Sequence, residues 1–191
     1  MLDMRPRLYF DFVDPGSFLL LLRLDSLGVE YALDGFEMRP PTAPRVEPSD
    51  PLWTDYWDSV AAALRDANVE PAQPRRVPWT RKAHELAVHA AKAGSPGTHG
   101  RLVERLFRAF VEDGIDLGRI DVLIGLAEDE GLDRTEARAV LDVDRYRDTV
   151  DDRRRAAVER GVRGVPTLLQ GDRRLEGIHD VNTLRAFIGA D

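Results

Sequence analysis

The first forty residues contain a strand, a helix and a second strand in close succession. Arg7–Val13 is a short, aromatic-rich apolar run, which is typical of a buried strand. A turn and helix start follow at residues 14–16, Ser17–Leu27 is expected to form a buried helix, and Glu30–Met38 a second strand. Two strands joined through a helix are parallel, and their crossover is right-handed. The sequence therefore predicts an α/β fold.

The middle of the chain is predicted to be helical, because apolar residues recur there every three or four positions. Two proline-rich connections, at residues 39–51 and 70–78, flank the first of these helices. The expected helices are Leu52–Ala67, Thr80–Ala93 with Thr80 as its cap, His99–Glu112, Arg119–Glu130, Thr135–Leu141 and Asp144–Arg160.

The C-terminal segment returns to strands. Thr167–Gln170 and Arg173–Glu176 are expected to form a hairpin, and Asp180–Ile188 a last helix. Helices enclosed by strands at both ends of a chain favour an insertion into one small sheet domain. We therefore expect a discontinuous α/β domain of residues 1–40 and 161–191, with a helical insertion at residues 50–160.

The chain of 191 residues contains no cysteine, and this excludes disulfides, thiolate metal sites and cysteine nucleophiles. Its histidines do not suggest a metal site either. His84 and His89 are five residues apart, whereas two ligands on one helix face are four apart. No metal is expected.

The net charge of −7 argues against nucleic acid as a partner, because neutralising phosphates requires an excess of Lys and Arg. The apolar run Phe18–Leu22 is shorter than the about 20 residues of a membrane span, and acidic residues precede it, unlike in a signal peptide. We therefore expect a cytoplasmic protein without membrane association.

Two motifs show a resemblance to a known family. YFDFVDPGSF (Tyr9–Phe18) and GVRGVPTLL (Gly161–Leu169) resemble the first strand–turn–helix and the cis-proline segment of the DsbA-like branch of the thioredoxin superfamily. KAHEL (Lys82–Leu86) and Leu106–Leu123 resemble parts of its helical domain. The branch includes disulfide oxidoreductases, 2-hydroxychromene-2-carboxylate isomerases and kappa-class glutathione transferases. The resemblance implies a thioredoxin-like fold with an inserted all-helical subdomain.

The chain departs from this family at the active-site turn. Members carry Cys-Pro-x-Cys or Ser-Pro-x-Ser there, whereas this chain has Asp14-Pro15-Gly16-Ser17. Thiol–disulfide exchange requires a thiolate, which neither Asp14 nor Ser17 can supply. In relatives that use glutathione, the resemblance implies a serine hydroxyl beside the glutathione thiolate. A carboxylate there would repel it, by ~4 kcal/mol for charges ~4 Å apart at an effective dielectric constant of ~20.

Asp14 and Ser17 are the candidate catalytic residues. Asp14 could act as a general base, but Asp is also a preferred N-cap and Pro a preferred first helical residue. Ser17 could donate a hydrogen bond to a ligand, or it could be an ordinary first-turn serine. The capping interpretation is the stronger one for Asp14.

The resemblance also implies a ligand-binding set formed by Pro15, Val165, Pro166, His179 and Asp180. A cis-Pro166 would leave the Val165 backbone free to pair with a peptide or with glutathione. His179-Asp180 stands where relatives hold the γ-glutamyl end of glutathione with Ser-Asp or Asn-Asp. The alternatives are a proline at a strand start for Pro166 and a helix cap for Asp180.

Two hypotheses follow. The chain is either an isomerase-like or transferase-like enzyme that uses glutathione or a small organic substrate, or a non-catalytic module that holds a peptide or metabolite. A homodimer is possible in both. Three tryptophans, Trp53, Trp57 and Trp79, could line the cleft, although packing in the core is the expected role for them.

Overall fold

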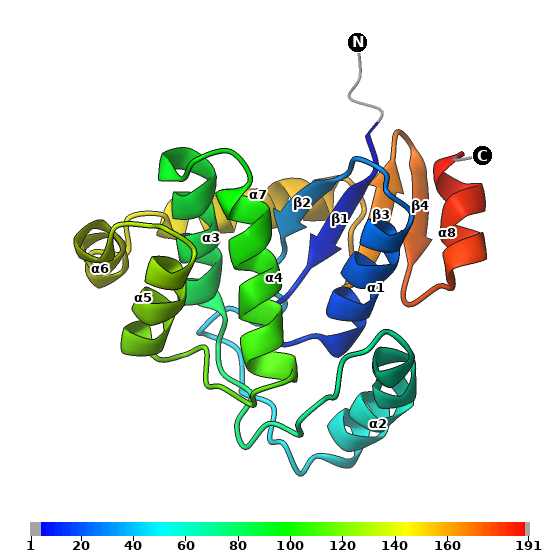
Figure 1. Ribbon diagram of the computed structural model, residues 1–191, viewed down its shortest axis with the longest axis horizontal. Helices are drawn as coiled ribbons and strands as arrows, with labels where there is room; N and C mark the ends of the chain where they lie inside the picture. The colour runs from blue at the N-terminus through cyan, green and yellow to red at the C-terminus, as the bar shows by residue number, and fades with distance from the viewer. Residues whose placement is uncertain (1–4, 190–191) are drawn as a thin grey trace.

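The computed structural model describes residues 5–189 and contains a four-stranded sheet. Its strands are β1 (Arg7–Phe10), β2 (Ala32–Gly35), β3 (Thr167–Gln170) and β4 (Arg173–Glu176), in the order β2-β1-β3-β4 (Figure 1). β1 pairs parallel with β2, with Leu8 opposite Leu33, and antiparallel with β3, with Leu8 opposite Leu168. β3 and β4 form an antiparallel hairpin. The predicted parallel pair and C-terminal hairpin are confirmed.

Helices connect and cover this sheet. α1 (Pro15–Ser26) joins β1 to β2, and α8 (Val181–Ile188) follows β4. The helices between β2 and β3 are α2 (Pro51–Asp66), α3 (Arg81–Ala93), α4 (Thr98–Val111), α5 (Ile120–Asp129), α6 (Arg134–Asp142) and α7 (Arg147–Glu159). The α/β fold is confirmed.

The predicted helix bounds differ from those of the structure by up to three residues, and three further predictions are wrong in detail. β1 ends at Phe10, because the chain turns at Asp11, whose carbonyl accepts a hydrogen bond from the Asp14 amide. β2 spans only Ala32–Gly35. Thr80 precedes α3 but its side chain does not cap the helix, because it interacts with the Asp11 carboxylate instead.

Alternating residues of β1 pack on opposite faces of the sheet, as the two-residue period of a strand requires. Leu8 and Phe10 belong to the main core with α1 and α4, whose aromatic centre is Phe107. Its ring stacks on Phe18 at 5.3 Å between centroids and lies 5.4 Å from that of Phe10. Tyr9 belongs to a smaller cluster on the other face, with Ala157 of α7. In Figure 1, α1 and α4 lie in front of the sheet and α7 behind it.

The main core thus includes residues of both the sheet segments and the helical block. The division into two domains stays a prediction. Within residues 5–189, no helix combines the length and the apolar character needed to cross a bilayer.

Candidate functional site

The site is built around the start of α1, where Asp14 is the N-cap. Its Oδ2 atom accepts hydrogen bonds from the Ser17 amide at 2.7 Å and from the Ser17 hydroxyl at 2.5 Å. Pro15 is the first helical residue, a position where a missing N–H costs nothing. The capping role expected for Asp14 is therefore present in the structure.

A second contact to Asp14 comes from α2. The Tyr56 hydroxyl donates to Asp14 Oδ1 at 2.6 Å. Gly16 leaves the space for this approach, because a Cβ atom at that position would overlap the Tyr56 hydroxyl and press on Ile178. The glycine of the active-site turn thus has a packing role here.

The Asp14 carboxyl has an unusual proton affinity. Asp14 is only 9% exposed, and this burial raises the pKa of its carboxyl to about 6. The hydrogen bonds from Ser17 and Tyr56 act in the opposite direction and lower the pKa. The negative charge of Asp11 adds to the increase. Burial and the neighbouring carboxylate also raise the pKa of the Tyr56 hydroxyl.

Asp11 is a second buried carboxylate, at the end of β1. Its Oδ2 accepts from the Met38 amide at 2.8 Å, and its Oδ1 lies 3.2 Å from His84 Nε2. Burial alone would raise the pKa of Asp11, but the interactions with His84, Thr80 and Met38 hold it below its ordinary value. Asp11 therefore stays ionised, and it disfavours a second negative charge on Asp14.

A cleft of about 520 Å³ opens beside Asp14, and residues of α2 form part of its lining. Figure 1 shows α2 beyond the end of the sheet at which α1 begins. The walls of the cleft are mainly apolar. The lining residues are Asp11, Val13, Asp14, Met38, Arg39, Val46, Asp50, Leu52, Trp53, Tyr56, Val165, Pro166, Gly177 and Ile178.

The lining of the cleft also contains the Val165–Pro166 pair, whose peptide bond is cis. The Pro166 carbonyl accepts from the Gly177 amide at 2.9 Å, which holds the segment of Gly177 and Ile178 against it. The backbone N–H and C=O of Val165 make no hydrogen bond with any of residues 5–189. They offer a donor and an acceptor at the cleft.

The structure brings together some of the candidate residues from the sequence and separates others. Asp14, Val165 and Pro166 line one cleft, whereas Pro15 and the fully buried Ser17 do not line it. The other two candidates lie outside it. The partly exposed His179 has its Nε2 atom 2.8 Å from the Glu176 carbonyl oxygen, and Asp180 caps α8 by accepting from the Thr183 amide at 2.8 Å.

The tryptophans divide in the same way. Trp53 lines the cleft and also belongs to the core, and Trp57 packs only in the core. Trp79 lies elsewhere, under the guanidinium of Arg45 at 4.1 Å from the ring centroid.

Sequence reasoning missed Tyr56 and Arg39 as site residues. Tyr56 belongs to the apolar stripe of α2, so its spacing indicates packing and says nothing about its hydroxyl. The basic side chain of Arg39 directly after the expected strand Glu30–Met38 was a weak signal. It lines the cleft, and its guanidinium forms no ion pair or hydrogen bond with the described residues.

Comparison with known proteins agrees with this architecture. The chain is 29% identical over 178 residues to the uncharacterized protein YwbO of Bacillus subtilis, covering 88% of this chain and 84% of that one. A crystal structure of a probable DsbA oxidoreductase from Streptomyces coelicolor superposes with a TM-score of 0.83 at 22% identity, over 97% of this chain and 88% of the other. The structure of a 2-hydroxychromene-2-carboxylate isomerase superposes with a TM-score of 0.81 at 23% identity, over 97% of this chain and 95% of the other.

Because the sequence identities to these two structures are low, the similarity supports the fold of the chain and nothing about its activity. The sequence itself gives the assignment: residues 61–189 match the DSBA-like thioredoxin domain family. Since the chain has no cysteine, it lacks the thiols of that family's redox chemistry. The chain is a cysteine-free member of the DSBA-like thioredoxin domain family.

Proposed function

We propose that this chain is an enzyme that transfers a proton to and from a small organic substrate bound in the cleft, with Asp14 as the acid–base group. The observation that carries the proposal is that the Asp14 carboxyl lines a cleft and is nevertheless almost wholly buried, and this burial raises its pKa to about 6. A general acid–base catalyst works best when its pKa lies near the working pH. An ordinary aspartate is almost fully ionised at neutral pH and is a much weaker base.

The surroundings of Asp14 support this role. Tyr56 and the Ser17 hydroxyl hydrogen-bond the ionised carboxylate, so the group can lose its proton without becoming unsatisfied. Asp11 and burial favour the protonated form. These opposing influences leave both protonation states accessible near neutral pH, which a group that takes up and releases a proton requires.

The cleft indicates the class of substrate. Its volume is within the usual range for small-molecule sites, and its walls combine apolar side chains with a few polar groups. Arg39 could hold a carboxylate of the substrate, and the Val165 backbone could pair with an amide or carbonyl group. We therefore propose a compact carbonyl compound with a carboxylate. The isomerase of similar fold acts, by its name, on a hydroxychromene carboxylate.

Glutathione fits the site only in part. The Val165 backbone could bind its cysteinyl group, but the carboxylate of Asp14 stands where its thiol would be activated, and no cationic side chain among the described residues contacts that carboxylate. A nearby carboxylate opposes the ionisation of a thiol. The proposed reaction therefore does not depend on a glutathione thiolate.

A non-catalytic binding protein is the second candidate function. The observation that favours it is that both oxygens of Asp14 already accept hydrogen bonds from the protein, as expected of a purely structural cap. In this case Val165 and the apolar walls would hold a ligand without turnover.

Hydrogen exchange with solvent separates the two candidates even while the natural substrate is unidentified. The protein is incubated in D₂O with a panel of carbonyl compounds that bear a carboxylate, and deuterium incorporation at carbon is measured by NMR. The enzyme proposal predicts incorporation that Asp14→Asn abolishes. Ligands that bind in the cleft but exchange at the same rate in the variant would support the binding protein instead.

Calorimetric titration with reduced glutathione and S-methylglutathione addresses the cofactor separately. If the thiol is not used, both compounds bind with similar affinity or neither binds. The cytoplasmic location and a possible homodimer remain predictions, which cell fractionation and sedimentation analysis would check.

A further inference from the structure

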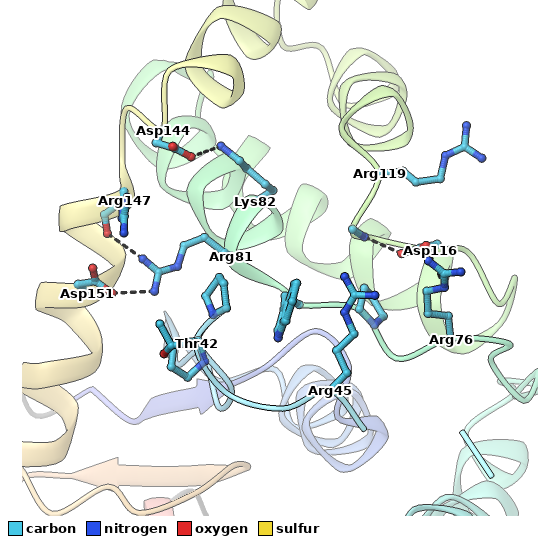
Figure 2. Close-up of a pocket in the computed structure, with 15 residues that line it drawn as sticks. Thr42, Arg45, Arg76, Arg81, Lys82, Asp116, Arg119, Asp144, Arg147 and Asp151 are labelled. Atoms are coloured by element: carbon cyan, nitrogen blue, oxygen red, sulfur yellow. Dashed lines mark hydrogen bonds and ion pairs between the residues drawn. The ribbon is translucent and has the colours of Figure 1, made fainter. Parts of the chain in front are cut away.

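Figure 2 shows a second cavity, of about 650 Å³. None of its lining residues belongs to the lining of the cleft. Four segments form this second cavity: the loop after β2, the connection before α3 together with the start of α3, the loop between α4 and α5, and the loop before α7 together with the first turns of α7. Nothing in the proposed function uses this cavity.

The walls of this cavity are rich in cationic side chains. Six basic residues and three acidic residues line it. The basic ones are Arg45, Arg76, Arg81, Lys82, Arg119 and Arg147, and the acidic ones are Asp116, Asp144 and Asp151. The whole chain carries a net charge of −7, so this lining is opposite in sign to the protein as a whole.

Most of these charges already have partners within the protein. Arg81 pairs with Asp151 at 2.7 Å and with the buried Glu37 at 2.5 Å. Lys82 pairs with Asp144 and contacts the Glu85 carboxylate at 3.4 Å. These pairs fix one wall of the cavity, and both acidic residues in that part of its lining, Asp144 and Asp151, have a cationic partner.

The opposite side is arranged in a similar way. Arg76 lies 3.9 Å from Asp116, whose other oxygen accepts from the Gly118 amide at 2.9 Å. Arg119 pairs with Asp121 at 2.6 Å. The acidic residues of the lining are therefore all occupied by cations or amides.

Arg45 and Arg147 are different. Neither guanidinium forms an ion pair or hydrogen bond within residues 5–189, and both side chains are exposed. The charge of Arg147 does lower the pKa of the Asp144 and Asp151 carboxyls, both of which already have a cationic partner. Figure 2 shows them on two sides of the cavity, with Arg81 between them. A guanidinium presents a planar set of donors that suits a carboxylate or phosphate.

Flat apolar groups complete the lining. Trp79 is held by a hydrogen bond from its indole N–H to the Ala43 carbonyl at 3.2 Å, and Arg45 lies over its ring. The rings of three prolines, Pro40, Pro41 and Pro78, lie in the same lining. A rigid ring surface beside two unpaired guanidinium groups suits a planar ligand with more than one negative charge.

We propose that this cavity is a second ligand site, which binds a small planar dianion: an aromatic phosphate monoester or an aromatic dicarboxylate. Arg45 and Arg147 bind the negatively charged group or groups, and the ring lies against the prolines and the part of Trp79 that Arg45 leaves uncovered. The site is independent of the acid–base chemistry at Asp14.

Binding of two simple probes tests this site. Phenyl phosphate and isophthalate are titrated by calorimetry against the full chain, with benzamide as an uncharged ring of similar size. The indole N–H signal of Trp79, assigned with Trp79→Phe, reports the place of binding by NMR. We expect saturable binding of at least one dianion, a shift of the Trp79 signal and no binding of benzamide.

Single substitutions then identify the residues. Arg45→Ala and Arg147→Ala should each weaken binding by about tenfold or more, because each removes charge-assisted hydrogen bonds. Arg155→Ala is the matched control, since Arg155 lies on the same helix as Arg147 and pairs with Asp152 away from the cavity. All three side chains are exposed, so the variants should melt like the wild-type protein.

The two probes also separate the two sources of charge. If only phenyl phosphate binds tightly, the ligand class is an aromatic phosphate monoester. If only isophthalate binds tightly, the ligand class is an aromatic dicarboxylate. Absence of binding by both dianions would overturn the proposal. The proposal would also be overturned if neither Arg45→Ala nor Arg147→Ala weakened binding, or if the control Arg155→Ala weakened binding as much as they do.

Discussion

Asp14→Asn should change how the stability of the protein depends on pH. The pKa of the Asp14 carboxyl rises from 3.8 to about 6 on folding, so the folded protein binds this proton more tightly than the unfolded chain. The stabilisation of the folded state by the protonated Asp14 carboxyl is therefore complete below pH ~4 and is lost as the pH rises through about 6. Asn does not ionise, and it retains an oxygen that can cap α1.

The size of the effect follows from the difference in pKa. Two pKa units correspond to about 3 kcal/mol, of which about 2 kcal/mol falls between pH 4.5 and pH 8. Asp14→Asn should therefore gain about 2 kcal/mol of unfolding free energy relative to the wild-type protein over this range. All other titrating groups are common to both proteins and cancel in the difference.

Urea unfolding followed by circular dichroism at several pH values measures this difference directly. Asp180→Asn is a suitable control, because Asp180 also caps a helix but is exposed and has a lowered pKa. Its difference from wild type should not rise with pH. Parallel stability curves for wild type and Asp14→Asn would refute the assignment of a raised pKa to Asp14.

Three further substitutions test the contacts of the site and the packing of the main core. Tyr56→Phe removes a hydrogen bond that lowers the pKa of Asp14, so an NMR titration should find that pKa above its wild-type value; an unchanged or lower value would count against the contact. Gly16→Ala should destabilise the fold by roughly 1–3 kcal/mol in urea unfolding, because its methyl group would overlap the Tyr56 hydroxyl, and wild-type stability would contradict this packing. Phe107→Ala should lower the free energy of unfolding by about 3–5 kcal/mol in the same assay, since this fully buried ring packs among aromatic rings of the core. A loss of unfolding free energy below about 1 kcal/mol would show that the helical block does not depend on this ring.

The fold could be predicted largely from local patterns. The turn after β1, the cap at Asp14 and the C-terminal hairpin all depend on residues close in sequence, and the structure contains each of them. Apolar spacing likewise located the helices to within a few residues. Such features follow from backbone preferences, which act over a few residues.

The chemistry of the site could not be predicted in this way, because it depends on contacts between distant segments. The Tyr56–Asp14 bond joins residues 42 positions apart, and the contact between His84 and Asp11 joins residues 73 apart. In the sequence, Tyr56 and His84 are ordinary members of helical patterns. Only tertiary packing shows that they surround two buried carboxylates, and this burial determines the pKa of Asp14.

The most direct test of the account is the pKa of the Asp14 carboxyl itself. It can be measured by following the carboxyl carbon signal of Asp14 in ¹³C-aspartate-labelled protein from pH 3.5 to pH 8.5, with Asp14→Asn identifying the signal. The account predicts a midpoint of about 6. A midpoint at or below the ordinary value of about 4 would contradict it, because Asp14 would then be a permanently ionised helix cap with no capacity for proton transfer near neutral pH.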